Sequence, residues 1–220
     1  RLEATVTLRN SNKEVIPEVI ERKAVLFTNT LGWVMDNSIW GPTGPVDGLR
    51  ALVYLGYTSD IKYSNVNYFS VIGDYRYYQR FAQTTLLAFR AAIFYNEGKE
   101  ARLYYVGGSW DLRGWPRFGI RGEKIWLTSL EFRFPLIDQL GIRFPFFNLG
   151  FPGIRGAIFY DMGGAWNDDY TSTIGSVGFG FRFNLFGVMT LRYDMGQKIE
   201  ENYSRFQDGW FYQFFFGWDF

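Results

Sequence analysis

The sequence predicts an all-β protein, a transmembrane antiparallel β-barrel with about ten strands present. Aromatic residues make up 21% of the 220 residues, and 25 residues are glycine. A water-soluble interior of this size has too little room for so many rings. No stretch approaches the roughly 20 consecutive apolar residues that a membrane-spanning helix needs. Apolar residues instead alternate with polar ones at the period of two that a β-strand produces.

Alternation predicts the strands in order along the chain. In the segment 174–184, for example, Val177, Phe179 and Phe181 share one face, and Gly178 and Gly180 lie on the other. One face of each strand is apolar, whereas the other carries charge and glycine. The predicted strands lie near 1–9, 24–38, 49–58, 66–78, 83–94, 126–134, 154–163, 174–184, 187–196 and 209–220.

A soluble β-sandwich alternates too, with its apolar face inside. Ring density and a nearly balanced set of charges on the opposite face favour an apolar face turned outward to lipid. Paired charges suit a narrow, crowded lumen. The charges assigned to the inner face are Arg50, Arg76, Arg90, Arg133, Arg182 and Arg192, against Asp74, Glu131, Asp161 and Asp194.

The last eleven residues carry an aromatic residue at every second position. This row includes Phe214, Phe216, Trp218 and the terminal Phe220. It resembles the C-terminal signal by which bacterial outer-membrane barrels are recognised during assembly. Two further rings, Phe211 and Phe215, fall on the inner face, where we expect another part of the chain to pack against them.

A periplasmic Phe220 fixes the side of each connection. Antiparallel strands then place five connections outside the cell: 10–23, 59–65, 95–125, 164–173 and 197–208. Four turns lie in the periplasm, near 39–48, 79–82, 135–153 and 185–186. The turn at 135–153 is long for that side, and the pattern gives no reason for its length.

The composition argues against most catalytic functions. Lys and Arg number 23 and Asp and Glu 22, and the chain has no cysteine and no histidine. The near-neutral charge argues against a nucleic-acid partner, and the missing residues remove thiolate sites and the usual general base. We expect no enzyme, no cofactor and no metal site. The acids Asp168 and Asp169 beside Asn167 suggest calcium, but loop acids of this kind are more often merely solvated.

No linker or charge run divides the chain, so residues 1–220 are read as a single domain. The chain begins at Arg1 and shows no signal peptide. We therefore expect N-terminal sequence to be missing. Outer-membrane lipid is the partner that the apolar face predicts.

The long connection 95–125 contains the motif Leu112-Arg113-Gly114-Trp115. This motif resembles the (V/I/L)-R-G-(F/Y/W) signature of the outer-membrane assembly factor and surface-antigen superfamily, which includes BamA-like barrels and two-partner secretion translocators. Two later segments extend the resemblance. Phe159, Asp161 and Gly163 match the family's F-x-D-x-G, and Glu131 lies on the inner face of the strand before it.

The resemblance implies that the loop folds into the lumen, where Arg113 meets Glu131 and Asp161. A guanidinium offers carboxylates a planar fork that lysine cannot match, and Gly114 lets the backbone turn where a Cβ would clash. The competing interpretation leaves Arg113 solvated and pairs the two acids with Arg133 or Arg155.

The resemblance also implies a function. Family barrels have sixteen strands, five of them after this loop, so the chain looks like the C-terminal ten strands, without six strands or any periplasmic POTRA domains. We expect a barrel in the outer membrane of a Gram-negative-type bacterium that assists insertion or translocation of client polypeptides. The alternatives are a barrel that anchors or exports a fused N-terminal domain, and a small porin-like channel.

Overall fold

The computed structural model describes residues 23–151, 153–185 and 189–217. Its described residues form strands joined by turns and loops, and neighbouring strands pair antiparallel, as the sequence predicts. Within these ranges, no helix is long and apolar enough to cross a membrane. The predicted strand at 1–9 lies outside the described residues.

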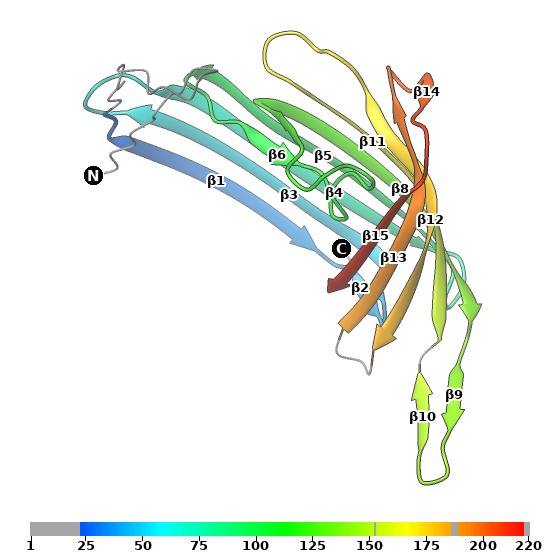
Figure 1. Ribbon diagram of the computed structural model, residues 1–220. Coiled ribbons are helices and arrows are strands. Elements are labelled where there is room, and N and C mark those ends of the chain that lie inside the picture. Colours follow the sequence, from blue (N-terminus) through cyan, green and yellow to red (C-terminus); the bar gives the residue numbers. More distant parts are fainter. Residues whose placement is uncertain (1–22, 152, 186–188, 218–220) are drawn as a thin grey trace.

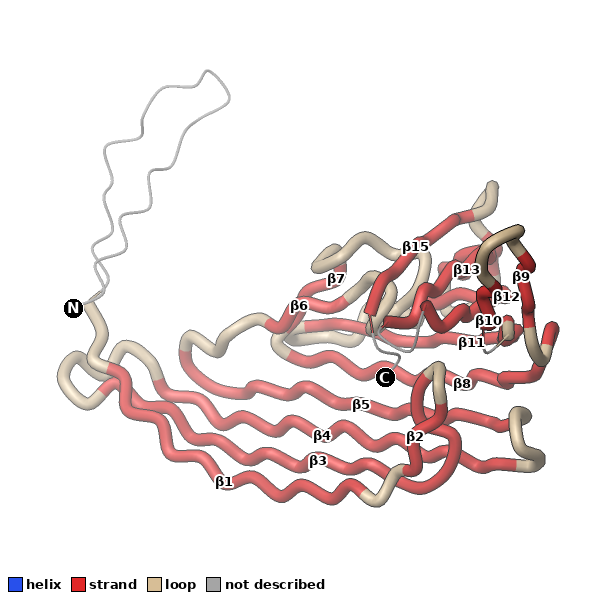
Figure 2. Tube along the Cα trace, turned by 90° about the horizontal axis from the view of Figure 1, so that it is seen from below, coloured by secondary structure: helices blue, strands red, loops and turns tan. Residues whose placement is uncertain are grey.

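The main sheet is a single curved wall (Figures 1 and 2). Every predicted strand from 24–38 onward has a counterpart in it. In spatial order the wall contains β1 (Leu26–Asp36), β3 (Gly44–Asp60), β4 (Asn67–Arg80), β5 (Leu86–Lys99), β8 (Lys124–Ile137), β11 (Ile154–Trp166), β12 (Ile174–Leu185) and β13 (Met189–Glu200), with β14 (Arg205–Phe206) and β15 (Phe211–Gly217) both paired to β13.

The wall does not close into the predicted barrel. Among the described residues, β1 pairs only with β3, and β15 pairs only with β13. Both therefore keep one edge whose backbone groups have no strand beside them. The structure is an open, strongly bent sheet with a concave and a convex side (Figure 2).

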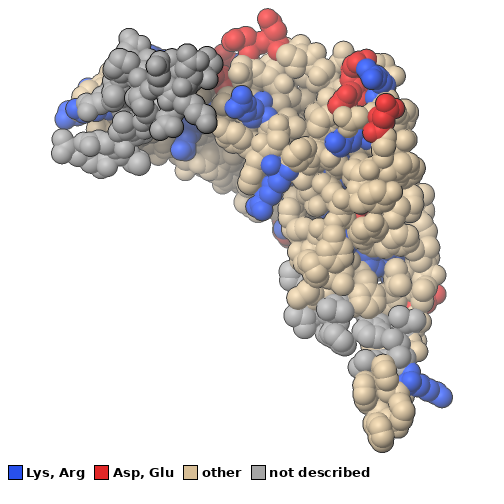
Figure 3. All heavy atoms as spheres, in the orientation of Figure 1, with Lys and Arg blue, Asp and Glu red and all other residues tan. Residues whose placement is uncertain are grey.

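Alternation along the wall assigns the two faces correctly. On β8, Leu130 and Phe132 are exposed on the convex side, whereas Glu131 and Arg133 are buried on the concave side. In Figure 3 the acidic side chains lie mainly along the upper edge, whereas Lys and Arg side chains are scattered over the surface below. Many large apolar side chains of the wall strands are exposed, among them Val53, Leu55, Phe69, Ile93 and Ile158. An exposed apolar area of this extent is typical of a surface that contacts a membrane or a partner.

The long connection between β5 and β8 is shorter than predicted, because both strands extend further. It runs over residues 100–123 and contains two short paired strands, β6 (Tyr104–Val106) and β7 (Ile120–Gly122). Figures 1 and 2 place this segment on the concave side of the wall. The connection is shorter because strand pairing continues to Lys99 at the end of β5 and begins at Lys124 in β8.

The predicted turn at 135–153 is in fact a small hairpin. After Ile137 the chain forms β9 (Leu140–Arg143) and β10 (Asn148–Phe151), which pair only with each other among the described strands. Figure 1 shows this hairpin extending beyond the lower end of the wall. Alternation missed it because its apolar residues do not alternate regularly with polar ones.

The predicted turn at 39–48 also folds into structure. The short β2 (Ile39–Gly41) pairs with the first residues of β3. From there the chain reaches across the concave side. The amide nitrogen of Asn184 donates to the carbonyl oxygen of Pro42, and Arg133 Nη1 donates to that of Pro45 at 3.3 Å. A buried cluster supports this connection, in which Val46 packs against Tyr78, Leu86 and Ala88.

Tyr203, in the turn after β13, makes a hydrogen bond to β11 near the upper end of the wall. The hydroxyl of Tyr203 donates to the carbonyl oxygen of Asp161, and its ring lies 5.2 Å from that of Tyr160. A Cβ on Gly175 would collide with Tyr203, so the glycine makes room for the ring. Burial raises the pKa of the Tyr203 hydroxyl, which keeps it protonated as a donor.

Replacing Tyr203 with Phe is expected to lower the free energy of unfolding by about 1 kcal/mol, the net value of one hydrogen bond. Because folding raises this pKa, the contribution is fully present below the unfolded value of about 10 and is lost only as pH rises through the folded pKa. Denaturant unfolding in detergent at pH 7 and pH 9 should give the same loss. The exposed Tyr105, changed to Phe, is the control, and an equal loss there would contradict the assignment.

Candidate functional site

The site lies where the loop of residues 100–123 meets the concave face of the wall. Its backbone is tightly folded, because Gly107, Gly108 and Gly114 all have positive φ angles. The amide of Gly108 donates to the carbonyl oxygen of Trp115 at 3.0 Å and closes the bend. Leu112 is buried under this bend. The fold of the loop therefore presents the next side chain, Arg113, to the wall.

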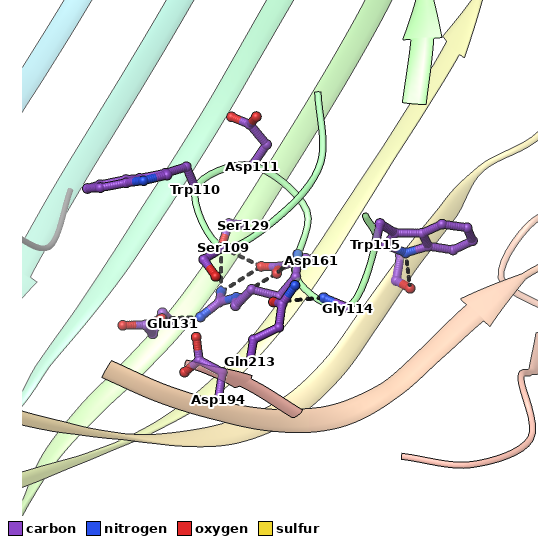
Figure 4. Close-up of polar contacts among 12 residues, drawn as sticks. Ser109, Trp110, Asp111, Gly114, Trp115, Ser129, Glu131, Asp161, Asp194 and Gln213 are labelled. Atoms are coloured by element: carbon purple, nitrogen blue, oxygen red, sulfur yellow. Dashed lines mark hydrogen bonds and ion pairs between the residues drawn. The ribbon is translucent and has the colours of Figure 1, made fainter. Parts of the chain in front are cut away.

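Arg113 is the centre of the site. Its Nε and Nη2 atoms each donate to one carboxylate oxygen of Asp161 at 2.6 Å, which is a bidentate pair. Nη2 also donates to the hydroxyl of Ser129 at 3.0 Å, and Nη1 donates to Glu131. Figure 4 shows these groups converging from the loop and from two strands. The Arg113 side chain is only 2% exposed, so the pairing occurs away from solvent.

Strand register places the partners of Arg113 together. Asp161 on β11 stands opposite Ser129 on β8, and Phe159 stands opposite Glu131. All four therefore share the concave face. The guanidinium of Arg113 lies over the ring of Phe159 at 3.8 Å from its centroid, in cation–π geometry. Gly163, the next residue of the F-x-D-x-G segment on that face, is opposite Leu127, and a Cβ there would lie 3.0 Å from the Trp126 carbonyl oxygen.

The acids of the site belong to a larger buried network. Glu131 also accepts from Arg133 Nε at 2.6 Å and from Arg182 Nη2 at 2.7 Å. Arg182 continues to Asp194 at 3.0 Å, and Asp194 accepts from Arg192 at 2.6 Å. The sequence predicted that these side chains face inward but not how they connect. Of the competing partners, Arg133 does bond Glu131, whereas Arg155 pairs with Asp138 at 3.6 Å.

Further contacts extend the loop across the wall. Arg90 Nη1 on β5 donates to the carbonyl oxygen of Trp110 at 2.6 Å, and Arg192 on β13 donates to that of Ser109. At the other end of the motif, the indole nitrogen of Trp115 donates to the carbonyl oxygen of Gly175 on β12 at 3.1 Å. The loop is thus bound to strands from β5 to β13.

The inward rings of the last strand pack against the same loop. Phe215 meets Trp110 edge to face, with ring centroids 4.6 Å apart. Phe211 packs beside Gly114, where a Cβ would approach its ring to 2.6 Å. The amide of Gly114 also donates to Gln213 at 3.0 Å. The packing that the sequence requires for these two rings comes from the loop.

The aromatic row of the last strand lies on the opposite face. Phe214 and Phe216 are both more than half exposed, and their ring centroids lie 4.4 Å apart. Trp218 and Phe220, the other two residues of the expected assembly signal, lie outside the described residues. Their role and that of Phe214 and Phe216 stay predictions.

In chemical terms, arginines engage the carboxylates of the site and so tie the loop to the wall. In the described part of the chain, no group of three or more His, Cys, Asp or Glu residues is placed to hold a metal ion. Asn167, beside the two loop acids, accepts from the amide of Glu123 at 3.0 Å. Two contributors, Ser129 and Gln213, were not singled out from the sequence, although alternation places both on the inner face.

Comparison with known families agrees with this geometry. The model of the Omp85 superfamily domain matches residues 21–217, which is most of the chain. No curated protein matches the chain. The match confirms the resemblance to BamA-like and surface-antigen barrels drawn from the motifs. This chain belongs to the Omp85 superfamily.

Proposed function

We propose that the chain forms part of an outer-membrane β-barrel that assists the insertion or translocation of client polypeptides, with its lumen plugged by the loop of residues 100–123. Membership of the Omp85 superfamily supports this proposal, since that family is associated with protein insertion and translocation at the outer membrane of Gram-negative bacteria. The apolar convex face then contacts lipid.

One observation carries the proposal: Arg113 joins the loop to Asp161 and Glu131 in a buried, bidentate pairing. Ordering a long loop costs conformational entropy, and a loop inside a lumen therefore needs an anchor. Removing one partner of a buried ion pair leaves an uncompensated charge, which is strongly unfavourable. Arg113 thus acts as a structural and gating residue, and we propose no catalytic role for it.

The wall supplies the second part of the mechanism. The outer edge of β15 offers backbone donors and acceptors that a client strand can pair with. In the complete barrel, which we propose has sixteen strands, this edge forms one side of the seam between the first and last strands. The loop keeps the lumen closed while client strands pair at the seam.

The proposal is tested with the full-length protein in its own outer membrane. Arg113→Ala should reduce the amount of folded client barrels or of exported polypeptide, because the plug loses its anchor. Arg113→Lys should reduce it less, because it keeps the charge but loses the fork. The matched control is Arg121→Ala, since Arg121 lies in the same loop and is exposed.

Client assembly that stays normal in Arg113→Ala, with equal barrel levels, would contradict the proposal. Steady open conductance of the unmodified protein in planar bilayers would instead favour a simple channel. A plugged lumen should conduct little, whereas Arg113→Ala should conduct more.

A further inference from the structure

The hairpin of β9 and β10 is a separate structural unit. Its strands pair with each other, Arg143 opposite Asn148, and with no other described strand. The turn is closed by the amide of Phe144, which donates to the carbonyl oxygen of Phe147 at 2.8 Å. Figure 1 shows it beyond the lower end of β8 and β11. A two-stranded hairpin alone in water is marginally stable, so a hairpin in this position needs a surface to lie against.

The tip of the hairpin is apolar and uncovered. Phe144 and Phe147 stack with their ring centroids 4.6 Å apart and remain 42% and 52% exposed. Phe146 between them is 96% exposed. Three phenylalanines together on a protruding tip are an apolar patch of the kind that marks a contact site.

The surface at the base of the hairpin is continuous with the apolar outer face of the wall. Leu136 and Ile137, the last residues of β8, are 48% and 40% exposed. Beside them is an apolar hollow of about 430 Å³ on the wall. Its lining includes Phe134, Leu136, Ile158 and Phe181. The same kind of surface therefore runs from the wall onto the hairpin.

The distribution of charged residues on the hairpin agrees with a lipid neighbour. Between Asp138 and Arg155 the only charged residue is Arg143, which is exposed and lies next to the aromatic tip. A basic residue beside apolar rings fits the boundary of a bilayer, where the rings enter the acyl region and the cation meets phosphate. A tip facing water would instead carry polar and charged residues.

We infer that the β9–β10 hairpin is a membrane-contacting foot, whose tip inserts Phe144, Phe146 and Phe147 into the periplasmic leaflet of the bilayer that surrounds the wall. The inference rests on the proposed outer-membrane function, because it takes the convex face as the lipid-facing one. The partner is the phospholipid surface itself. The foot would fix the depth and tilt of the strands on which it is built.

The experiment uses spin labels, which suit these 220 residues because they contain no cysteine, and any cysteine elsewhere in the full-length protein is first changed to serine. Single cysteines are introduced by Phe146→Cys at the tip, Phe132→Cys on the outer wall and Asp169→Cys in the loop at the other end. The labelled full-length protein is reconstituted in vesicles of phosphatidylethanolamine and phosphatidylglycerol. Collision of each label with oxygen, which enriches in lipid, is compared with collision with a water-soluble nickel chelate. Phe146 is almost fully exposed, so its replacement removes little packing.

The expected result is a label at 146 that, like the label at 132, collides mainly with oxygen, while the label at 169 collides with the chelate. A different outcome is a label at 146 that collides mainly with the chelate, as the label at 169 does, while the label at 132 still collides with oxygen. That result would overturn the inference that the hairpin contacts the membrane and would leave the proposed function standing. A label at 146 shielded from both reagents also overturns it, because the tip then packs against protein. A label at 132 that collides with the chelate overturns the lipid-facing wall and the foot together.

Discussion

Glu131→Gln is expected to destabilise the wall by about 3–5 kcal/mol, the range found when one partner of a buried ion pair is removed. Glu131 is 1% exposed and accepts hydrogen bonds from Arg113, Arg133 and Arg182. Glutamine keeps the shape of the side chain but removes the negative charge that separates three cations. Because two of these arginines belong to the wall, the loss should affect the sheet as well as the loop.

Stability is measured on the full-length protein in detergent, from the temperature at which the folded band on a gel converts to the unfolded one. The control is Glu201→Gln, which removes an exposed ion pair with Arg205 at 3.2 Å. Exposed pairs contribute about 0–1 kcal/mol, so this variant should behave almost as the unmodified protein. Equal shifts in the two variants would show that the buried network does not stabilise the wall.

Gly114→Ala is expected to dislodge the loop while leaving the wall folded. Gly114 has a φ of +85°, and a Cβ there would lie 2.6 Å from the ring of Phe211. The positive φ costs about 1–3 kcal/mol for a residue other than glycine, and overpacking adds about 1–3 kcal/mol. Together these two costs can exceed the free energy that holds the loop on the wall. Limited proteolysis should therefore cut within residues 100–123 faster than in the unmodified protein.

Gly209 provides a matched control, because its φ is +89° but nothing lies within 4 Å of the position of a Cβ. Gly209→Ala therefore carries the backbone cost without the collision, and it leaves the loop untouched. Adding Phe211→Ala to Gly114→Ala should restore part of the protection by removing the ring. Unchanged cleavage in Gly114→Ala would mean that the loop is not packed against the last strand.

Strand order and the two faces of the wall could be predicted from the sequence, because a strand with one apolar face leaves a period of two in the chain. Leu130 and Glu131 illustrate this, since neighbouring residues of opposite character lie on opposite faces. The hairpin of β9 and β10 could not be predicted this way, because Phe144, Phe146 and Phe147 are apolar regardless of face.

The candidate site was predictable in part. The motif around Arg113 and the inward position of Asp161 can be read from the chain. The pairing of Glu131 with Arg182 depends instead on the register between β8, β11 and β12, which alternation does not fix. The contact between Asn184 and Pro42 depends on how strongly the wall bends, which no local pattern records.

Arg133 connects the loop network to the chain at the opposite end of the wall. Its Nε donates to the same carboxylate that receives Arg113, and its Nη1 donates to Pro45, in the connection at the opposite end of the strands. Two segments that enter the concave side from opposite ends are thus linked through two side chains of β8, Glu131 and Arg133. A change at Glu131 is therefore expected to affect the start of β3 as well as the loop, because Arg133 bonds both the Glu131 carboxylate and the Pro45 carbonyl oxygen.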